Sequence, residues 1–318
     1  MPHKIVFMGT PDFAVESLKQ ILESGIEVAA VVTSPDRPAG RGQQVKMSAV
    51  KTFAQEQNLR VLQPEKLKSD EFINELKTLN ADLFVVVAFR MLPEIVWDMP
   101  PKGTINLHGS LLPQYRGAAP INWAVINGDQ QTGATTFFIE KEIDTGKIID
   151  KVTLPISEED TAGSIHDRLM VKGAELLTKT VNNIFEGKVE AIAQDQLNLD
   201  TPLKHAPKIF KADCKINWSH STKTIHNKIR GLSPYPTAWT EIIDNKGKKK
   251  SLKIFNTRYK IDEQNNTGKI LENENGVFFG TNNGWIQLLE LQLEGKKRMS
   301  IDQFTAGFNF KEAELVLQ

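Results

Sequence analysis

The chain has 318 residues, of which 40% are apolar and 25% are charged. This length accommodates two domains with separate hydrophobic cores, and this composition excludes a largely disordered chain or a fibrous protein. The formal net charge is zero, from 39 basic and 39 acidic residues.

Cysteine content and the length of apolar runs exclude further classes of protein. Cys214 is the single cysteine, which excludes an intrachain disulfide and a cysteine-based zinc cluster. No stretch approaches the roughly 18 consecutive apolar residues that span a bilayer. Met1-Pro2-His3-Lys4 leads straight into an apolar strand pattern, without the architecture of a signal peptide. We therefore expect a cytoplasmic protein that has no membrane partner.

The N-terminal half alternates short, continuously apolar runs with amphipathic segments, as parallel strands covered by helices do. The pattern predicts strands over 4–8, 28–32 and 83–87, and helices over 12–23, 49–57 and 70–79. Further strands are predicted over 103–107, 134–139 and 147–154, followed by a helix over 161–185. The predicted fold class is therefore α/β with a Rossmann-like parallel sheet. The turn Gly9-Thr10-Pro11-Asp12 lacks the G-x-G-x-x-G spacing of a dinucleotide site, which disfavours a dehydrogenase.

Periodicity is lost from about residue 188 to residue 207, as expected for a surface linker. We predict a catalytic domain over 1–189, a linker over 190–207 and a C-terminal domain over 208–318. After the linker, the pattern predicts one helix over 221–230 and short strands over 238–243, 252–258, 268–271, 276–280 and 285–293. Closely spaced short strands favour a small β-barrel, for which the oligonucleotide-binding (OB-like) type is one candidate.

The zero net charge is the sum of two unlike parts. Residues 1–203 carry 20 Lys/Arg and 27 Asp/Glu, whereas residues 204–318 carry 19 Lys/Arg and 12 Asp/Glu. A basic C-terminal part is compatible with a nucleic-acid-facing module, and equally with solvated lysines on a small barrel.

The stretch from Asn106 to Pro120 is the most informative for chemistry. Asn106 and His108 are two residues apart at the end of a predicted strand, so their side chains share one face where open α/β sheets bind ligands. An amide and an imidazole there can donate hydrogen bonds to an oxyanion, and His108 can also move a proton. Asp144 can orient this histidine or accept a proton. The alternative is structural, since Asn and Asp-x-Gly often form turns and a single His is often a hydrogen-bonded core residue.

At this point the sequence resembles the folate-dependent formyltransferases, and within them the branch that acts on methionyl-tRNA. The motifs that carry the resemblance are Asn106-x-His108-x-Ser110-Leu-Leu-Pro113, Arg116-Gly117, Asp144-Thr-Gly146, Gly9-Thr10-Pro11-Asp12-Phe13-Ala14, Pro35-Asp36-Arg37-Pro38-Ala39-Gly40-Arg41-Gly42 and Arg230-Gly231-Leu232-Ser233-Pro234. They run in order from the first strand to about residue 236. Beyond that residue the resemblance rests on the barrel-like organisation.

The resemblance implies that the α-amine of initiator methionyl-tRNA attacks the formyl carbon of 10-formyltetrahydrofolate, without a metal. Carried onto this chain, the catalytic trio is Asn106, His108 and Asp144. The implied folate-binding residues are Ser110, Leu111, Leu112 and Pro113, and also Phe89, Arg90 and Leu92 after the strand that ends at Val87.

The resemblance also gives candidate residues for binding the tRNA. Arg37, Arg41 and Lys46 lie in a loop whose composition suits a mobile segment that becomes ordered against phosphates. The alternative is a solvated surface loop that makes no contact with RNA. Lys248, Lys249 and Lys250 form a cluster at a predicted hairpin tip that could dock the acceptor arm or remain a solvated turn. We expect a monomer.

Three other functions fit parts of the sequence. A formyltransferase that acts on a sugar-nucleotide amine shares the chemistry, and a formyl-folate hydrolase needs only the trio. A non-catalytic RNA-binding protein is disfavoured because Asn106, His108 and Asp144 are all intact.

Overall fold

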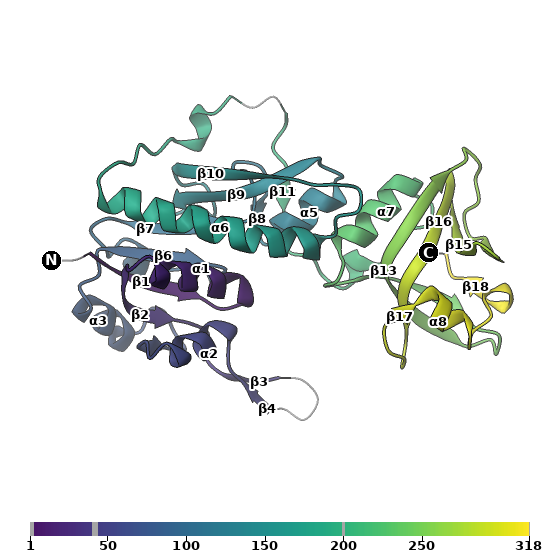
Figure 1. Cartoon of the computed structure of the whole chain (residues 1–318), viewed down its shortest axis with the longest axis horizontal. Coiled ribbons are helices and arrows are strands. Elements are labelled where there is room, and N and C mark those ends of the chain that lie inside the picture. Colours follow the sequence, from purple (N-terminus) through teal and green to yellow (C-terminus); the bar gives the residue numbers. More distant parts are fainter. Residues whose placement is uncertain (1–2, 40–43, 199–200, 318) are drawn as a thin grey trace. The chain divides into compact units, whose positions relative to one another are not determined.

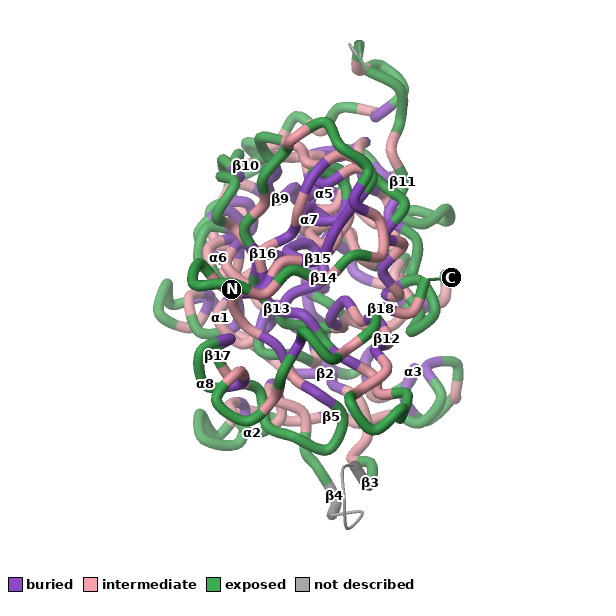
Figure 2. Tube along the Cα trace, turned by 90° about the vertical axis from the view of Figure 1, so that its right-hand side faces the viewer, coloured by how far each residue is buried: buried purple, intermediate pink, exposed green. Residues whose placement is uncertain are grey.

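The computed structural model describes residues 3–39, 44–198 and 201–317. The chain divides into two compact units, the first comprising Met1–Gly117, Thr132–Leu154 and His166–His205. The second comprises Ala118–Gln131, Pro155–Ile165 and Ala206–Gln318. Two short segments that the sequence pattern assigns to the N-terminal domain, 118–131 and 155–165, thus group with the C-terminal part. Figure 2 shows that buried residues are concentrated in the regular elements, while many connecting loops are exposed.

The first unit is built on a seven-stranded sheet with the order β10-β9-β7-β6-β1-β2-β5 (Figure 1). The strands are β1 (Lys4–Gly9), β2 (Glu27–Val32), β5 (Val61–Leu62), β6 (Leu83–Val87), β7 (Thr104–His108), β9 (Gln131–Phe138) and β10 (Ile148–Pro155). β1, β2, β5, β6 and β7 are parallel. The apolar runs of the central strands are buried: β1 from Ile5 onward and all five residues of β6, whereas β2 is buried only from Ala30 to Val32 and β10 alternates with exposed residues.

Helices flank the strands of this sheet in sequence, and amphipathic segments predict all of them except the short α4. They are α1 (Asp12–Glu23), α2 (Ala49–Glu56), α3 (Asp70–Thr78), α4 (Glu94–Trp97) and α6 (Ala162–Phe185). The Ser48 side chain caps α2 by accepting a hydrogen bond from the Lys51 backbone N–H. Among the described residues, none of the helices combines the length and the hydropathy that a membrane crossing requires.

The predicted α/β fold is confirmed, and the sheet differs from the prediction at one edge. β9 runs antiparallel to β7, with His108 opposite Thr135. Between β7 and β9 the chain forms the short strand β8 (Arg116–Gly117) and the helix α5 (Pro120–Ile126). The sequence pattern also misses the short elements β3 (Arg37–Ala39), β4 (Gln44–Lys46), β5 and α4.

The second unit contains the predicted small β-barrel, an antiparallel sheet with the strand order β14-β15-β16-β13-β12-β18 and β17 paired to β16. Its strands are β12 (Ala238–Ile243), β13 (Lys249–Ile261), β14 (Ile270–Asn273), β15 (Gly276–Thr281), β16 (Gly284–Leu293), β17 (Met299–Ser300) and β18 (Glu314–Leu315). Its helices are α5 (Pro120–Ile126), α7 (Thr222–Gly231) and α8 (Ile301–Thr305). Outside these two sheets, the two-residue strands β8 (Arg116–Gly117) and β11 (His205–Ala206) pair with each other. Trp218, Phe279 and Phe310 are fully buried in the barrel core.

The motif from Arg230 to Pro234 ties separate segments of the second unit together. The buried Arg230 guanidinium donates hydrogen bonds to the carbonyl oxygens of Ser157 (3.0 Å) and Asp160 (2.9 Å). The Gly163 N–H donates to the Ser233 carbonyl at 3.0 Å. This motif therefore holds the segment that precedes α6 against α7.

Candidate active site

The carboxyl end of β7 places Asn106 and His108 on one face of the strand, as their spacing predicts. His108 is 7% exposed. The Asn106 Oδ1 atom is buried and has no hydrogen-bond partner among the described residues. An unsatisfied buried polar atom is costly, so one at the ligand-binding end of a sheet is a strong indication of function.

A hydrogen bond to the backbone fixes the tautomer of the His108 ring. Its Nε2 lies 2.9 Å from the Tyr115 carbonyl oxygen, which can only accept, so Nε2 carries the proton. In neutral His108 the lone pair is therefore on Nδ1. Nδ1 lies 3.8 Å from Asp144 Oδ2, close enough for the carboxylate to stabilise an imidazolium.

Asp144 reaches His108 from the connection between β9 and β10. The backbone of Asp144 is left-handed (φ +56°), and its side chain is 11% exposed. Its Oδ2 accepts a hydrogen bond from the Gly117 N–H at 2.9 Å. The structure thus brings His108 and Asp144 together, with Asn106 on the same face of β7 as His108.

The predicted folate segment after β7 is a loop held by its own neighbours. The Thr135 hydroxyl donates to the Ser110 carbonyl (2.7 Å) and accepts from the Leu112 N–H (3.1 Å). The Lys151 ammonium donates to the Leu112 carbonyl at 2.7 Å, and burial lowers the pKa of this lysine. Ser110 and Leu112 are both 0% exposed. In this conformation they therefore build the loop, and Leu111 is the half-buried member of the segment.

The second predicted folate segment follows β6, which pairs with β7 through Val87 and Leu107. The Arg90 guanidinium donates to the carbonyls of Pro64 and Glu65, which follow β5. It lies 5.6 Å from the centre of the Phe89 ring. Burial lowers the pKa of Arg90.

Leu92, the third residue predicted in this segment, is 7% exposed and packs in the apolar core. Arg90 and Leu92 therefore shape this loop, while Phe89 is half-buried.

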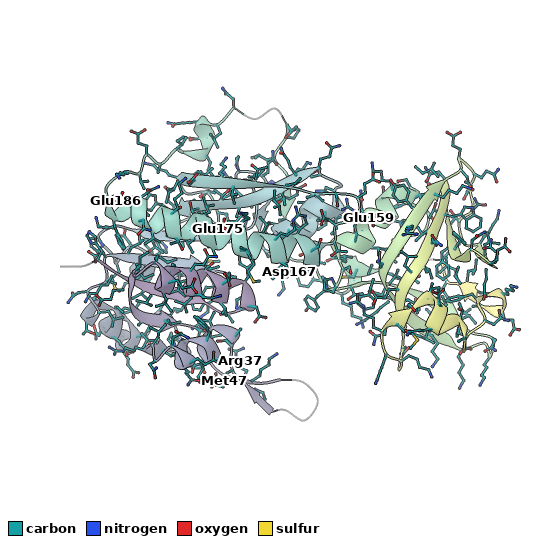
Figure 3. All side chains as sticks on the ribbon, viewed as in Figure 1. Arg37, Met47, Glu159, Asp167, Glu175 and Glu186 are labelled. Carbon is teal, nitrogen blue, oxygen red and sulfur yellow. The ribbon has the colours of Figure 1, made fainter. Side chains whose placement is uncertain are left out.

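The predicted tRNA loop corresponds to the β3–β4 hairpin. Arg37 and Met47 both lie at the base of this hairpin (Figure 3), and Arg37 and Lys46 are exposed. Arg41 lies outside the described residues. At the base of the hairpin, Asp36 accepts hydrogen bonds from Lys51 (2.5 Å) and the Gln63 side chain (2.8 Å). These hydrogen bonds hold the pKa of Asp36 below its ordinary value, with the larger effect from Lys51.

The lysine cluster of the barrel lies at the start of β13. Lys248 is exposed and Lys250 is half-buried. Lys249 forms an ion pair with Glu241 at 3.0 Å, and Glu241 also pairs with Lys215 at 2.9 Å. The positive charge of Lys249 is thus partly compensated.

One residue beside the active site, Gln194, has no recognisable signal in the sequence. Gln194 falls in the predicted linker, yet it is 5% exposed and hydrogen-bonded to Arg116 and to the backbone of the Asp144 turn. A single glutamine in an aperiodic polar stretch carries no sequence signal of burial. In residues 3–39, 44–198 and 201–317, no group of three His, Cys, Asp or Glu side chains is arranged to hold a metal ion.

Comparison with known proteins identifies the family of the chain. The family model for formyl transferase matches residues 3–181, and that for the formyl transferase C-terminal domain matches residues 208–309. Two relatives called methionyl-tRNA formyltransferase come from Parabacteroides distasonis and Bacteroides fragilis. The first is 53% identical over 96% of this chain and 95% of its own length. The second is 49% identical over 98% of this chain and 96% of its own length.

Among solved structures, the sugar 3N-formyl transferase WlaRD superposes with a TM-score of 0.63 at 21% identity. The match covers 93% of this chain and 100% of that one, and it shows a shared fold. The two methionyl-tRNA formyltransferases, by contrast, are about 50% identical to this chain over nearly its full length, which shows the family as well as the fold. The chain therefore belongs to the formyl transferase family and, within it, to the methionyl-tRNA formyltransferases, a family of formyl-transferring enzymes.

Proposed function

We propose that the chain transfers the formyl group of 10-formyltetrahydrofolate to the α-amine of initiator methionyl-tRNA. The amine nitrogen attacks the formyl carbon, the bond from that carbon to N10 of the folate breaks, and N10 gains a proton. The products are N-formylmethionyl-tRNA and tetrahydrofolate. The observation that carries the proposal is the group of Asn106, His108 and Asp144 at the carboxyl end of β7, in a chain with full-length relatives of this name.

Asn106 stabilises the negative charge of the tetrahedral intermediate. Its side-chain amide donates a hydrogen bond to the oxygen that becomes an oxyanion when the amine adds. The buried Oδ1 atom, which has no partner among the described residues, supports this role because Asn106 is not used to hold the fold together.

His108 moves the proton. With Nε2–H committed to the Tyr115 carbonyl, the Nδ1 lone pair of neutral His108 accepts a proton from the attacking amine. Asp144, at 3.8 Å from Nδ1, stabilises the imidazolium, which then gives the proton to N10 as the folate leaves. Each proton is accounted for without a covalent enzyme intermediate.

The folate donor lies at the carboxyl ends of β6 and β7. Phe89 and Leu111 are the half-buried apolar residues of the two predicted segments, and they supply apolar surface for a pteridine. The buried members of these segments keep the two loops in place. Ligand binding at this edge agrees with the general position of ligands in open α/β sheets.

The tRNA is held by basic groups in both units. Arg37, Arg41 and Lys46 of the hairpin contact the acceptor end, and Lys248, Lys249 and Lys250 contribute to phosphate binding from the barrel. Exposure of Arg37, Lys46 and Lys248 supports this assignment. In this scheme residues 1–189 carry the chemistry and residues 208–318 bind the tRNA.

The acceptor is tested by competition. The purified chain is given labelled 10-formyltetrahydrofolate together with methionyl-tRNA and a 4-amino-sugar nucleotide, and the labelled products are separated. We expect the label on methionyl-tRNA. Label on the sugar nucleotide would instead favour the sugar formyltransferase, and label in free formate regardless of acceptor would favour a hydrolase.

A further inference from the structure

Gln194 is a buried amide beside the active-site turn. It begins a short 3₁₀ turn (Gln194–Gln196) after α6, and its side chain makes four hydrogen bonds. Its Oε1 accepts from Arg116 Nε (3.1 Å) and Arg116 Nη2 (2.7 Å). Its Nε2 donates to the carbonyl oxygens of Asp144 (2.9 Å) and Gly146 (2.8 Å).

Arg116 fixes the orientation of this amide. A guanidinium can only donate hydrogen bonds, so it must face the oxygen of the amide rather than the nitrogen. The two carbonyl oxygens on the other side can only accept, so they must face the NH₂ group. Turning the amide over would lose all four hydrogen bonds, and Gln194 therefore has one stable orientation between Arg116 and the Asp144 turn.

The turn that Gln194 holds has little freedom of its own. Asp144 adopts a left-handed backbone, which is unfavourable for a residue with a Cβ atom. A Cβ atom on Gly146 would lie 1.7 Å from the Phe138 carbonyl oxygen, so the turn is pressed against the end of β9. The Thr145 hydroxyl donates to the Glu142 carbonyl at 3.0 Å. Such a strained turn persists only where its surroundings hold it.

We propose that Gln194 is a positioning residue for formyl transfer: it fixes the turn that places the Asp144 carboxylate beside His108. The inference rests on the proposed function, because it acts through the trio assigned there. Asp144 makes its hydrogen bond to Gly117 and approaches His108 only while its backbone stays in place. Loss of the two Gln194 donors frees the backbone on both sides of Thr145, and a displacement of about 1 Å can lower turnover about 100-fold.

Two substitutions separate positioning from folding. Gln194→Glu keeps the length of the side chain and an acceptor for Arg116, but it replaces the NH₂ donor with an oxygen that faces two carbonyl oxygens. Gln194→Ala removes both sets of hydrogen bonds. Gln196→Ala, in the same short turn but exposed, is the matched control.

Steady-state kinetics with methionyl-tRNA and 10-formyltetrahydrofolate give the first readout. We expect kcat to fall about 10- to 100-fold in both Gln194 variants, with the KM for 10-formyltetrahydrofolate changed less than about threefold. Gln196→Ala should stay within about twofold of the wild-type kcat. A Gln194→Glu enzyme that retains the wild-type kcat would overturn the proposal.

A double-mutant cycle with Asp144→Ala gives the second readout. If Gln194 acts through Asp144, then Gln194→Ala should lower kcat no further once Asp144 is already alanine. Losses that multiply would show an effect independent of Asp144 and would overturn the positioning role. The wild-type rate, measured in the same assay, tests the proposed function separately: an active wild type with unaffected Gln194 variants rejects this inference alone.

Discussion

Asn106 is a residue whose removal should cost activity and little stability. Its Oδ1 makes no hydrogen bond with the described residues, so Asn106→Ala leaves no partner of that atom unsatisfied. We expect a change in the free energy of unfolding of about 1 kcal/mol or less, and a fall in kcat of about 10²- to 10³-fold, the usual effect of losing one oxyanion donor. Asn106→Asp has the same shape but no amide donor, so it should be as impaired as the alanine variant. A wild-type kcat in Asn106→Ala would remove this residue from the catalytic assignment.

His226 should make the second unit less stable in acid. Burial lowers the pKa of His226 below its ordinary value of 6.5, Arg230 lowers it further, and Glu158 and Glu159 partly oppose this. The unfolded chain therefore binds a proton as the pH falls through 6.5, while the folded chain binds it only at lower pH. The contribution to stability is complete above pH 6.5 and declines below it, by up to about 1.4 kcal/mol per pH unit, until the pH passes the folded pKa.

The variant His226→Asn tests this dependence. Its amide can replace the hydrogen bond between His226 Nδ1 and the Thr257 hydroxyl (3.0 Å), but it cannot titrate. We expect the free energy of unfolding to fall less between pH 8 and pH 5.5 in His226→Asn than in the wild type, as measured by chemical denaturation. Replacement of the exposed His220 by Asn should leave the wild-type dependence unchanged. Equal slopes in wild type and His226→Asn would contradict the assignment.

At the residue scale, the sequence is informative where function depends on local spacing. Asn106 and His108 share a face because they are two residues apart on a strand, and predicting this needs no tertiary information. Gln194 cannot be found in this way, because its partners Arg116 and Asp144 are 78 and 50 residues away along the chain. Nor can burial of Ser110 and Leu112 be predicted from a motif typical of a loop.

The turn between β9 and β10 is the element on which the site depends most. Its close approach to the Phe138 carbonyl leaves no room for a side chain at Gly146. We expect Gly146→Ala to shift the turn and the Asp144 carboxylate with it, lowering kcat at least about 10-fold and the free energy of unfolding by about 1–3 kcal/mol. In Gly307→Ala the new Cβ would meet nothing within 4 Å, so both quantities should stay near wild type. Kinetics and denaturation of the two variants check this, and an unaffected Gly146→Ala would show that the turn tolerates displacement.

At the element scale, hydropathy predicts where strands lie better than which way they run. β9 is buried from Thr132 to Phe137, much as the parallel strands are, although it runs antiparallel to β7. A continuously buried strand indicates that both faces of its sheet are covered, but not whether the strand runs parallel or antiparallel to its neighbour. The two-residue strand β5 and the four-residue helix α4 are too short to show a period.

The whole molecule combines an acidic N-terminal part with a basic C-terminal part, a charge distribution that fits both phosphate binding by the barrel and solvated surface lysines. Lys249 pairs with Glu241, whereas Lys248 and Lys250 form no ion pair in the described part of the chain. Backbone hydrogen bonds from Lys248 and Lys246 lower the pKa of Asp244, and the nearby charges of Lys250 and Lys248 lower it further. If Lys248 and Lys250 contact phosphates, replacing both with Ala should make the plot of log affinity for tRNA against log salt less steep, by up to about two units.

The matched control carries the same change in net charge elsewhere. Lys19 and Lys77 are exposed on α1 and α3, and their joint replacement by Ala should leave the salt slope near wild type. Filter binding or anisotropy from low to moderate salt measures both variants. Equal slopes in the wild type and the Lys248/Lys250 variant would assign these lysines to a solvated turn.

We propose that this chain moves a formyl group onto the amine of methionyl-tRNA through the trio at the end of β7. A single-turnover assay with labelled 10-formyltetrahydrofolate tests it, comparing wild type with His108→Ala on methionyl-tRNA whose α-amine is free or acetylated. We predict that wild type transfers label to the free amine only, and that His108→Ala does so at least about 100-fold more slowly. Wild-type transfer to the acetylated acceptor, or an unchanged rate in His108→Ala, would rule out amine formylation through this trio.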